Sequence, residues 1–299
     1  MKAKKRWLFA ALALILAGVA ILGMTVLAVK GDFMKLSSGK YVTNEYTVGE
    51  DFDRIAIHTK TADVRILPAK DGRASVICYE EESRKHAVSV KEGCLSIDVV
   101  NGKKWYEHIG ILFGTPTVTV YLPKEHYAAL SVEGSTGAVT ASDLTFDTVT
   151  LTLSTGSATL TDVRVKDAAL KVTTGKVTLT DVTAENAAIR VTTGKTAITR
   201  LTCQNLTSSG NTGDIRLEDV IAENKITLTR STGDVTLLSS DAAELFIETD
   251  TGDVEGTLRS EKVFIVSTDT GDVDVPESTS GGKCKITTDT GDIEIRIQK

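Results

Sequence analysis

Apolar residues alternate with polar ones along most of this chain, and a Thr-Gly pair returns every 19 or 20 residues in its second half. The nine pairs begin at Thr136, Thr155, Thr174, Thr193, Thr212, Thr232, Thr251, Thr270 and Thr290. A fixed period of about 20 residues is typical of repeat proteins, whose units are too small to bury an apolar face alone and do so by stacking.

Aligning the nine units on their glycine separates inward from outward positions. Two residues after the glycine, seven of the nine units have Val or Ile, and two residues further on the position is again apolar, except at Gly256. This period of two indicates strands, and no unit shows the 3.6-residue period of a helix. The pattern predicts an all-β fold: a single-strand-stack β-solenoid of about nine regular rungs.

Turn residues recur at three places in the better-preserved units. The first is the glycine of the Thr-Gly pair, which tolerates a left-handed backbone. The second is an Asp six residues later, and the third is an Asn or Asp eleven residues later; the residues concerned are Asp143, Asp162, Asp181 and Asp219, then Asp167, Asn186, Asn205 and Asn224. Three corners suggest a three-sided coil, with a flattened two-sided coil as the alternative.

Residues 41–130 are less regular but also favour short strands. The expected strands are Ile55–His58, Val64–Leu67, Ala74–Tyr79, Ala87–Val90, Leu95–Val99 and Thr117–Leu122. Thr61-Ala62-Asp63-Val64 resembles a decayed copy of the later Thr-Gly-Asp-Val. We therefore predict an irregular N-terminal β cap over 41–130, which covers the first rung of a regular solenoid over 131–299.

The N-terminus has a different pattern. A basic tail, residues 1–6, precedes an uncharged run over 7–29, and a linker over 30–40 follows. Twenty-three helical residues are long enough to cross a bilayer, and the basic residues favour a cytoplasmic N-terminus. We expect a single-pass signal-anchor helix in the cell membrane with the β domain outside the cell; the alternative is a cleaved signal peptide.

The net charge limits the classes of binding partner, and the cysteine content limits disulfide bonding. Without the four basic residues of the tail, the net charge changes from −6 to −10, which argues against binding to nucleic acid or anionic lipid. Four scattered cysteines do not form a disulfide framework. One bond, between Cys78 and Cys94, is compatible with the pattern, and free thiols are the alternative.

These features resemble a bacterial family of β-strand repeats of unknown function known as "putative adhesin" domains. The resemblance rests on Phe52-Asp53-Arg54-Ile55, Ala62-Asp63-Val64-Arg65-Ile66, Val118–Pro123 and the Thr-Gly-Asp-Val repeats, and it covers about Tyr41–Lys299. The first four units depart from it, because Ala138, Ser157, Lys176 and Lys195 replace the Asp. The resemblance implies a β-solenoid in envelope proteins of Gram-positive bacteria, in some cases linked to envelope-stress sensing, without catalytic residues.

One group of residues is a candidate for metal chemistry. Asp214, Asp234, Asp253, Asp272 and Asp292 directly follow the last five glycines, and stacking would align their carboxylates. Such a ladder suggests a strip for divalent cations, whereas the simpler interpretation is that each Asp caps its own turn. The Asp-Thr-Gly triplets at 250–252, 269–271 and 289–291 cannot face each other in pairs as in an aspartic protease.

The remaining candidates are weaker. His58, His86, His108 and His126 have no spacing typical of a metal site or a catalytic triad. The aromatic insertion at Trp105-Tyr106 and Ile109–Phe113 either packs on the end of the rod or forms a contact site. We predict no catalytic residues and no cofactor.

Together these patterns predict a non-enzymatic cell-envelope module. It is anchored in the membrane through residues 7–29 and presents a scaffold to a partner protein or wall polymer, in adhesion or envelope-stress sensing. The alternatives are a polysaccharide-acting enzyme and a divalent-cation-binding rod.

Overall fold

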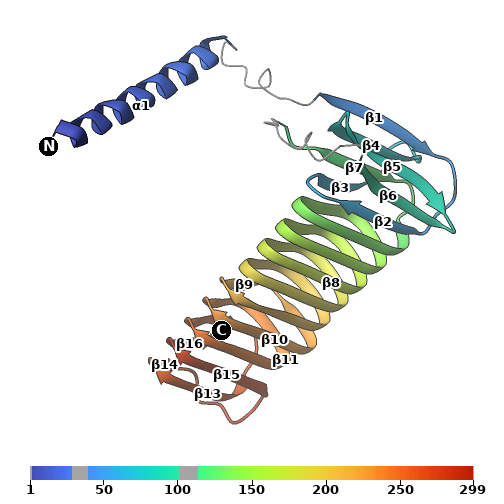
Figure 1. Cartoon of the computed structure of the whole chain (residues 1–299). Coiled ribbons are helices and arrows are strands. Elements are labelled where there is room, and N and C mark those ends of the chain that lie inside the picture. Colours follow the sequence, from blue (N-terminus) through green and yellow to red (C-terminus); the bar gives the residue numbers. More distant parts are fainter. Residues whose placement is uncertain (1, 29–39, 102–113, 299) are drawn as a thin grey trace.

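Strands dominate the protein outside one N-terminal helix. The computed structural model describes residues 2–28, 40–101 and 114–298 (Figure 1). Helix α1 spans Lys2–Ala28, and its segment Ala11–Ala28 has a mean hydropathy of 2.5, so it is long and apolar enough to cross a membrane. The mostly-β expectation is confirmed. The aromatic insertion predicted at 105–113 lies outside the described residues.

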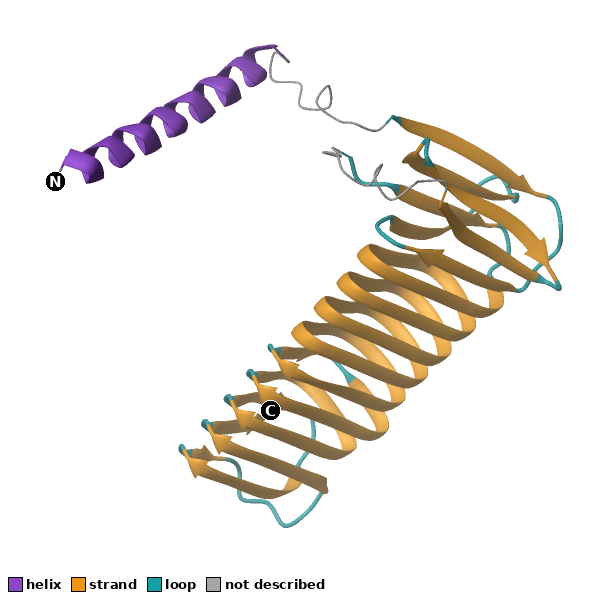
Figure 2. Ribbon diagram, viewed as in Figure 1, coloured by secondary structure: helices purple, strands orange, loops and turns teal. Residues whose placement is uncertain are grey.

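The strands form one mixed, 16-stranded sheet (Figure 2). Their bounds are β1 Tyr41–Val48, β2 Arg54–Thr59, β3 Asp63–Pro68, β4 Ala74–Glu81, β5 Arg84–Lys91, β6 Cys94–Asn101, β7 Thr117–Leu122, β8 His126–Thr212, β9 Ile215–Glu218, β10 Ile221–Thr232, β11 Val235–Thr251, β12 Val254–Leu258, β13 Lys262–Thr270, β14 Val273–Asp274, β15 Gly282–Thr290 and β16 Ile293–Ile297. All six strands expected between 41 and 130 are present, and β1 is an addition.

Successive repeat units pair in parallel, one repeat apart. Thr232 of β10 pairs with Thr212 of β8 on one side and with Thr251 of β11 on the other. The position two residues after the glycine is at most 1% exposed in eight of the nine units; the exception is Val273 in β14, at 45%. The predicted inward column is therefore part of the core of the stack, and burial of its Val and Ile side chains holds the units together.

The turn positions behave as the repeat predicts. Asp143, Asp162, Asp181 and Asp219 all have a φ between 53° and 58°, the left-handed conformation that Asp tolerates better than most residues. Arg200 and Ser239 occupy the same place in their units with φ of 54° and 49°. At the third position, Asn186 donates a hydrogen bond to Asp167 at 2.8 Å, and Asn205 donates one to Asn186 at 3.0 Å.

The decayed copy of the repeat lies where its sequence places it. In β3, Val64 pairs with Val139 of the first regular unit, and in β2, Ile55 pairs with Leu130. Strands β6 and β7 pair with the far sides of β2 and β3, so they form a further layer. The first layers of the stack are therefore built from residues within the predicted cap.

The last two units do not stack in chain order. Thr251 of β11 pairs with Thr290 of β15, two repeats later, and Thr290 also pairs with Thr270 of β13. Strand β16 likewise lies between β12 and β14. The unit with β15 and β16 is thus inserted between its two predecessors, which the simple period did not predict.

A buried ion pair accompanies this interleaving. Lys262 Nζ at the start of β13 lies 2.5 Å from Asp241 Oδ1 in β11, and its side chain is only 3% exposed. Lys262 pairs with Gly282 of the intervening strand, where a Cβ would press on the backbone of Ala243. The missing side chain at Gly282 lets the flanking strands approach closely enough for the ion pair to bridge them.

The cap adds antiparallel strands to the first layers. Strand β4 pairs with β1 and β7, and strand β5 pairs with β6. The β4–β5 hairpin is joined by the pair Glu81 and Arg84, beyond which its two strands diverge to different partners. Cys78 and Cys94 are both free thiols, so of the two alternatives left open by the sequence the structure has the free thiols.

Candidate functional site

The five aspartates singled out by the repeat do come together in one column. Asp234 N–H donates to Asp214 Oδ1 at 3.4 Å, and Asp253 N–H donates to Asp234 Oδ1 at 3.0 Å. The column continues with Asp292 N–H to Asp253 Oδ1 and Asp272 N–H to Asp292 Oδ1, both at 2.8 Å. Its order follows the interleaved strands and not the chain.

Each of these contacts ties one unit to the next, because a carboxylate oxygen accepts the backbone N–H of the neighbouring turn. Asp63 does the same in the decayed copy, accepting the Ala138 N–H at 2.8 Å. At the end of the column nearest the cap, Lys195 Nζ lies 2.9 Å from Asp214 Oδ2, and this hydrogen bond lowers the pKa of Asp214 below its ordinary value. A capping role explains the geometry, and cation binding by the column stays a prediction.

Asp253→Ala is expected to lower the free energy of unfolding by about 1 kcal/mol, because the Asp292 N–H loses its acceptor. Asp253→Asn keeps an acceptor oxygen and should recover most of that loss. Asp250→Ala removes the same charge from an exposed position in the same turn and serves as the control. Chemical denaturation of the three variants checks this; equal effects at Asp250 and Asp253 would show that only charge matters.

A cavity of about 530 Å³ lies at the cap end of the stack, four repeat units before Asp214, the first member of the column. The corners of the stack continue from Gly137 to Ala62, since Thr136 N–H donates to Lys60 O at 2.7 Å. Next to Ala62, Asp63 N–H donates to Pro116 O at 2.9 Å, and the cavity opens beside this contact. Its walls are Tyr41, Thr59–Asp63, Glu81, Arg84, His86, Val99, Gly114–Pro116, Thr136 and Gly137.

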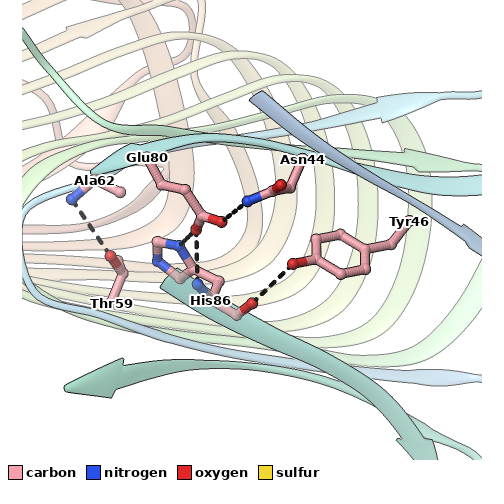
Figure 3. A network of polar contacts seen from close by, with 6 residues as sticks. All are labelled: Asn44, Tyr46, Thr59, Ala62, Glu80 and His86. Carbon is pink, nitrogen blue, oxygen red and sulfur yellow. Dashed lines mark hydrogen bonds and ion pairs between the residues drawn. The ribbon is translucent and has the colours of Figure 1, made fainter. Parts of the chain in front are cut away.

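A buried polar network holds His86, one residue of the cavity wall (Figure 3). Glu80 Oε2 accepts the backbone N–H of His86 at 2.6 Å and faces His86 Nδ1 at 2.7 Å, while Asn44 Nδ2 donates to Glu80 Oε1 at 2.6 Å. Tyr46 O–H donates to the carbonyl of His86 at 3.2 Å. Glu80 is fully buried and His86 is 4% exposed, so solvent does not share these contacts.

The network fixes the orientation of the imidazole. With Nδ1 directed at Glu80, the ring extends toward Thr59 and Ala62 (Figure 3), and both of these residues line the cavity. His86 Nε2 is buried and has no hydrogen-bond partner among the described residues. A buried nitrogen without a partner is rare in folded proteins and marks this wall as a place where a ligand can act.

A thiol lies against the same network. Cys78 Sγ, a Glu80 oxygen and a His86 nitrogen all lie within 4.8 Å of one another. Burial, with a smaller contribution from the Glu80 charge, raises the pKa of Cys78 to about 12. The thiol therefore keeps its proton at neutral pH.

The repeat pattern did not reveal this cluster. Cys78 and Glu80 alternate with half-buried residues in β4, and the chain brings His86 back to them after a two-residue turn. The alternation indicates that Cys78 and Glu80 lie on one face of β4. It does not indicate that His86 lies there too, because His86 reaches this face only where β4 and β5 diverge. The histidines at 58 and 126 form exposed pairs with Asp98 and Asp147 at 2.8 and 3.2 Å, and His108 lies outside the described residues.

Comparison with solved structures identifies related folds. A protein from Parabacteroides distasonis described as a "putative lipid binding protein" is 14% identical, with a TM-score of 0.51 over 87% of this chain and 98% of its own. A "putative adhesin" from Bacteroides fragilis is 17% identical, with a TM-score of 0.48 over 87% of this chain and 99% of its own. At these identities the first similarity shows the fold alone. No curated protein matches the chain.

The family assignment rests on the sequence. The profile described as Toastrack DUF4097 matches residues 52–258 and 199–299, which include the decayed copy in the cap and all nine Thr-Gly units. These are the segments that carry the resemblance to the "putative adhesin" repeats, so that resemblance is confirmed. The chain belongs to the Toastrack DUF4097 family.

Proposed function

We propose that this protein is a non-enzymatic, membrane-anchored module of the cell envelope, and that its cap binds a partner protein or wall polymer. In this proposal the stack of parallel units is a β-solenoid that serves as the scaffold, and α1 is the anchor. The observation that carries the proposal is that three cavities among the described residues border the cap.

Three of the described cavities are large enough for a small ligand and border the cap. Cavities of about 530, 450 and 350 Å³ border cap strands, whereas one on the stack between Thr227 and Thr287 holds about 70 Å³. The repeat units use their inward side chains for the core and several of their turn side chains for contacts with the next unit. This arrangement supports a structural role for the stack and a recognition role for the cap.

The length of the chain between anchor and cap limits where the partner can be. Residues 30–40 separate the apolar run from Tyr41, a wall residue of the 530 Å³ cavity. Eleven residues reach at most about 40 Å when fully extended. A partner bound at the cap would therefore be another membrane protein or a polymer close to the membrane, and this favours a role at the cell's own envelope over contact with a distant surface.

Site-specific photo-crosslinking in intact membranes tests the proposal. A crosslinking amino acid replaces either Thr61, at the cavity wall, or Thr173, on the stack; both threonines are exposed, so each probe reaches solvent. We expect crosslinked products from position 61 that mass spectrometry or glycan analysis can identify, and few from position 173. Equal or stronger crosslinking at 173 would place the binding surface on the stack instead.

The non-enzymatic part of the proposal has its own test. The purified full-length protein in detergent should leave isolated envelope glycans at their original length. Any depolymerisation would refute this part and favour the polysaccharide-acting alternative.

A further inference from the structure

We propose that Cys78, Glu80 and His86 form a binding site for a transition metal of the Zn²⁺ class inside the cap. This site is independent of the partner proposed for the cavity. Three side chains of the types that bind Zn²⁺ converge there, from two strands whose remaining pairings lead to different parts of the sheet.

The distances fit a coordination sphere. Zinc binds sulfur at about 2.3 Å and nitrogen or oxygen at about 2.0–2.2 Å, so tetrahedral ligand atoms lie roughly 3.3–3.8 Å apart. The three candidate atoms lie within 4.8 Å of one another, and Glu80 Oε2 is 2.7 Å from His86 Nδ1. Side-chain movements of about 1 Å would place all three around one ion. The hydrogen bond between Glu80 and His86 holds two of the ligands in place for it.

The donor set selects the kind of ion. A thiolate, an imidazole and a carboxylate together suit Zn²⁺ and similar borderline metals, whereas Mg²⁺ and Ca²⁺ prefer oxygen alone. The Cys78 thiolate and the Glu80 carboxylate would balance the two positive charges of the ion. A neutral total matters here, because Cys78 and Glu80 are fully buried and uncompensated charge is costly in such surroundings.

Proton release accompanies binding. The Cys78 thiol is protonated without metal, since burial raises its pKa to about 12, and the metal must displace this proton to form the metal–sulfur bond. If His86 Nδ1 becomes the ligand, its proton moves to Nε2, which has no hydrogen-bond partner among the described residues, so the imidazole stays neutral. His86 forms part of the wall of the 530 Å³ cavity, which gives the released thiol proton and the entering ion a route to solvent.

The neighbours of the three residues support the site. Asn44 Nδ2 donates to Glu80 Oε1 at 2.6 Å and so orients the carboxylate from outside the cluster, as residues around bound metals commonly do. A metal would join β4 to β5 beyond the point where their pairing ends. Its expected structural effect is a stiffer hairpin and a fixed position for the His86 wall of the cavity.

Cobalt titration of the full-length protein tests the proposal. The protein, in detergent and reduced, is first freed of metals and then titrated with Co²⁺. We expect one equivalent to produce a sulfur-to-cobalt charge-transfer band and the visible bands of tetrahedral Co²⁺, both removed by Zn²⁺. The unfolding midpoint should rise with Zn²⁺, because the ion binds the folded chain.

Variants locate the site. Cys78→Ser should abolish the charge-transfer band. His86→Asn should displace the visible bands. Cys203→Ser is the matched control, because Cys203 is also a buried thiol whose pKa burial raises to about 12, and it should keep the full spectrum. Glu80→Gln keeps the shape of the carboxylate and should weaken Co²⁺ binding at least about tenfold.

Two results would overturn the proposal: a wild-type protein that gives no such band at one equivalent of Co²⁺, or a band lost in Cys203→Ser and kept in Cys78→Ser. The wild-type titration decides the first of these even where a variant does not fold.

Discussion

Gly175→Ala is expected to lower the midpoint of thermal unfolding by about 10 °C or more, the larger of the two strongest effects we predict. The added Cβ would overlap the carbonyl oxygen of Gly156 and lie 2.8 Å from its carbon, in the unit directly below. Gly175 also has a φ of 144°, which side chains resist. Both effects act at a corner where backbone meets backbone, so no flexible side chain can move aside.

Two other glycines serve as graded controls. A Cβ at Gly49 would meet nothing within 4 Å, and the same is true at Gly72, whose φ is 70°. Gly49→Ala should therefore be close to neutral, and Gly72→Ala should cost about 1 kcal/mol from backbone conformation alone. Because stacked repeats can unfold in parts, the comparison uses circular dichroism midpoints under one set of conditions. If the unfolding midpoint of Gly175→Ala equals that of Gly72→Ala, the corners are less tightly stacked than described.

Arg230→Ala is the second large expected effect, at about 3 kcal/mol or more. Arg230 is 1% exposed at an inward position of the stack. Its Nε donates to Gly213 O and its Nη2 to Thr196 Oγ1, both at 3.0 Å. Truncation leaves a void, and the buried hydroxyl of Thr196 loses the hydrogen bond that Arg230 donates to it. Burial also lowers the pKa of Arg230 to about 10, which shows how strongly the site disfavours an isolated charge.

Variants that repair the site separate charge from packing. Arg230→Met fills most of the space and removes the buried charge, so it should cost less than Arg230→Ala. Adding Thr196→Val to Arg230→Met removes the hydroxyl that loses its partner and should recover further stability. Arg216→Ala, at an exposed arginine, should have little effect. Denaturant midpoints of the set provide the measurement, and equal midpoints for the Ala and Met variants would contradict this account.

Arg230 also shows which parts of the fold were predictable. The period of two located the inward column, including Thr196, its polar exception, but gave no reason for a Thr there. The reason comes from the next units: Arg230 pairs with Gly210, where any side chain would collide with the guanidinium, and it donates to Thr196. Three deviations from the repeat, far apart in the sequence, thus form one polar cluster in space.

The order of the last units was not predictable for a similar reason. The turns at Thr251, Thr270 and Thr290 all read Asp-Thr-Gly-Asp, so the local sequence fits any stacking order. The choice depends on contacts outside the turns, such as the close approach of Gly282 in β15 to the backbone of Ala243 in β11. The cap cluster was missed because His86 meets Cys78 and Glu80 only where β4 and β5 diverge, whereas the Asp column follows from the period alone and was predicted.

The interleaved end has a consequence for how the chain assembles as it emerges from the ribosome. Most units can dock as soon as they appear, each on the one before it. Strands β13 and β14 cannot, because their partners β15 and β16 emerge later and must take the place directly above β11 and β12. The segment 262–275 therefore waits outside the stack or is displaced from it, and folding of this end finishes only when residues 282–297 have been delivered.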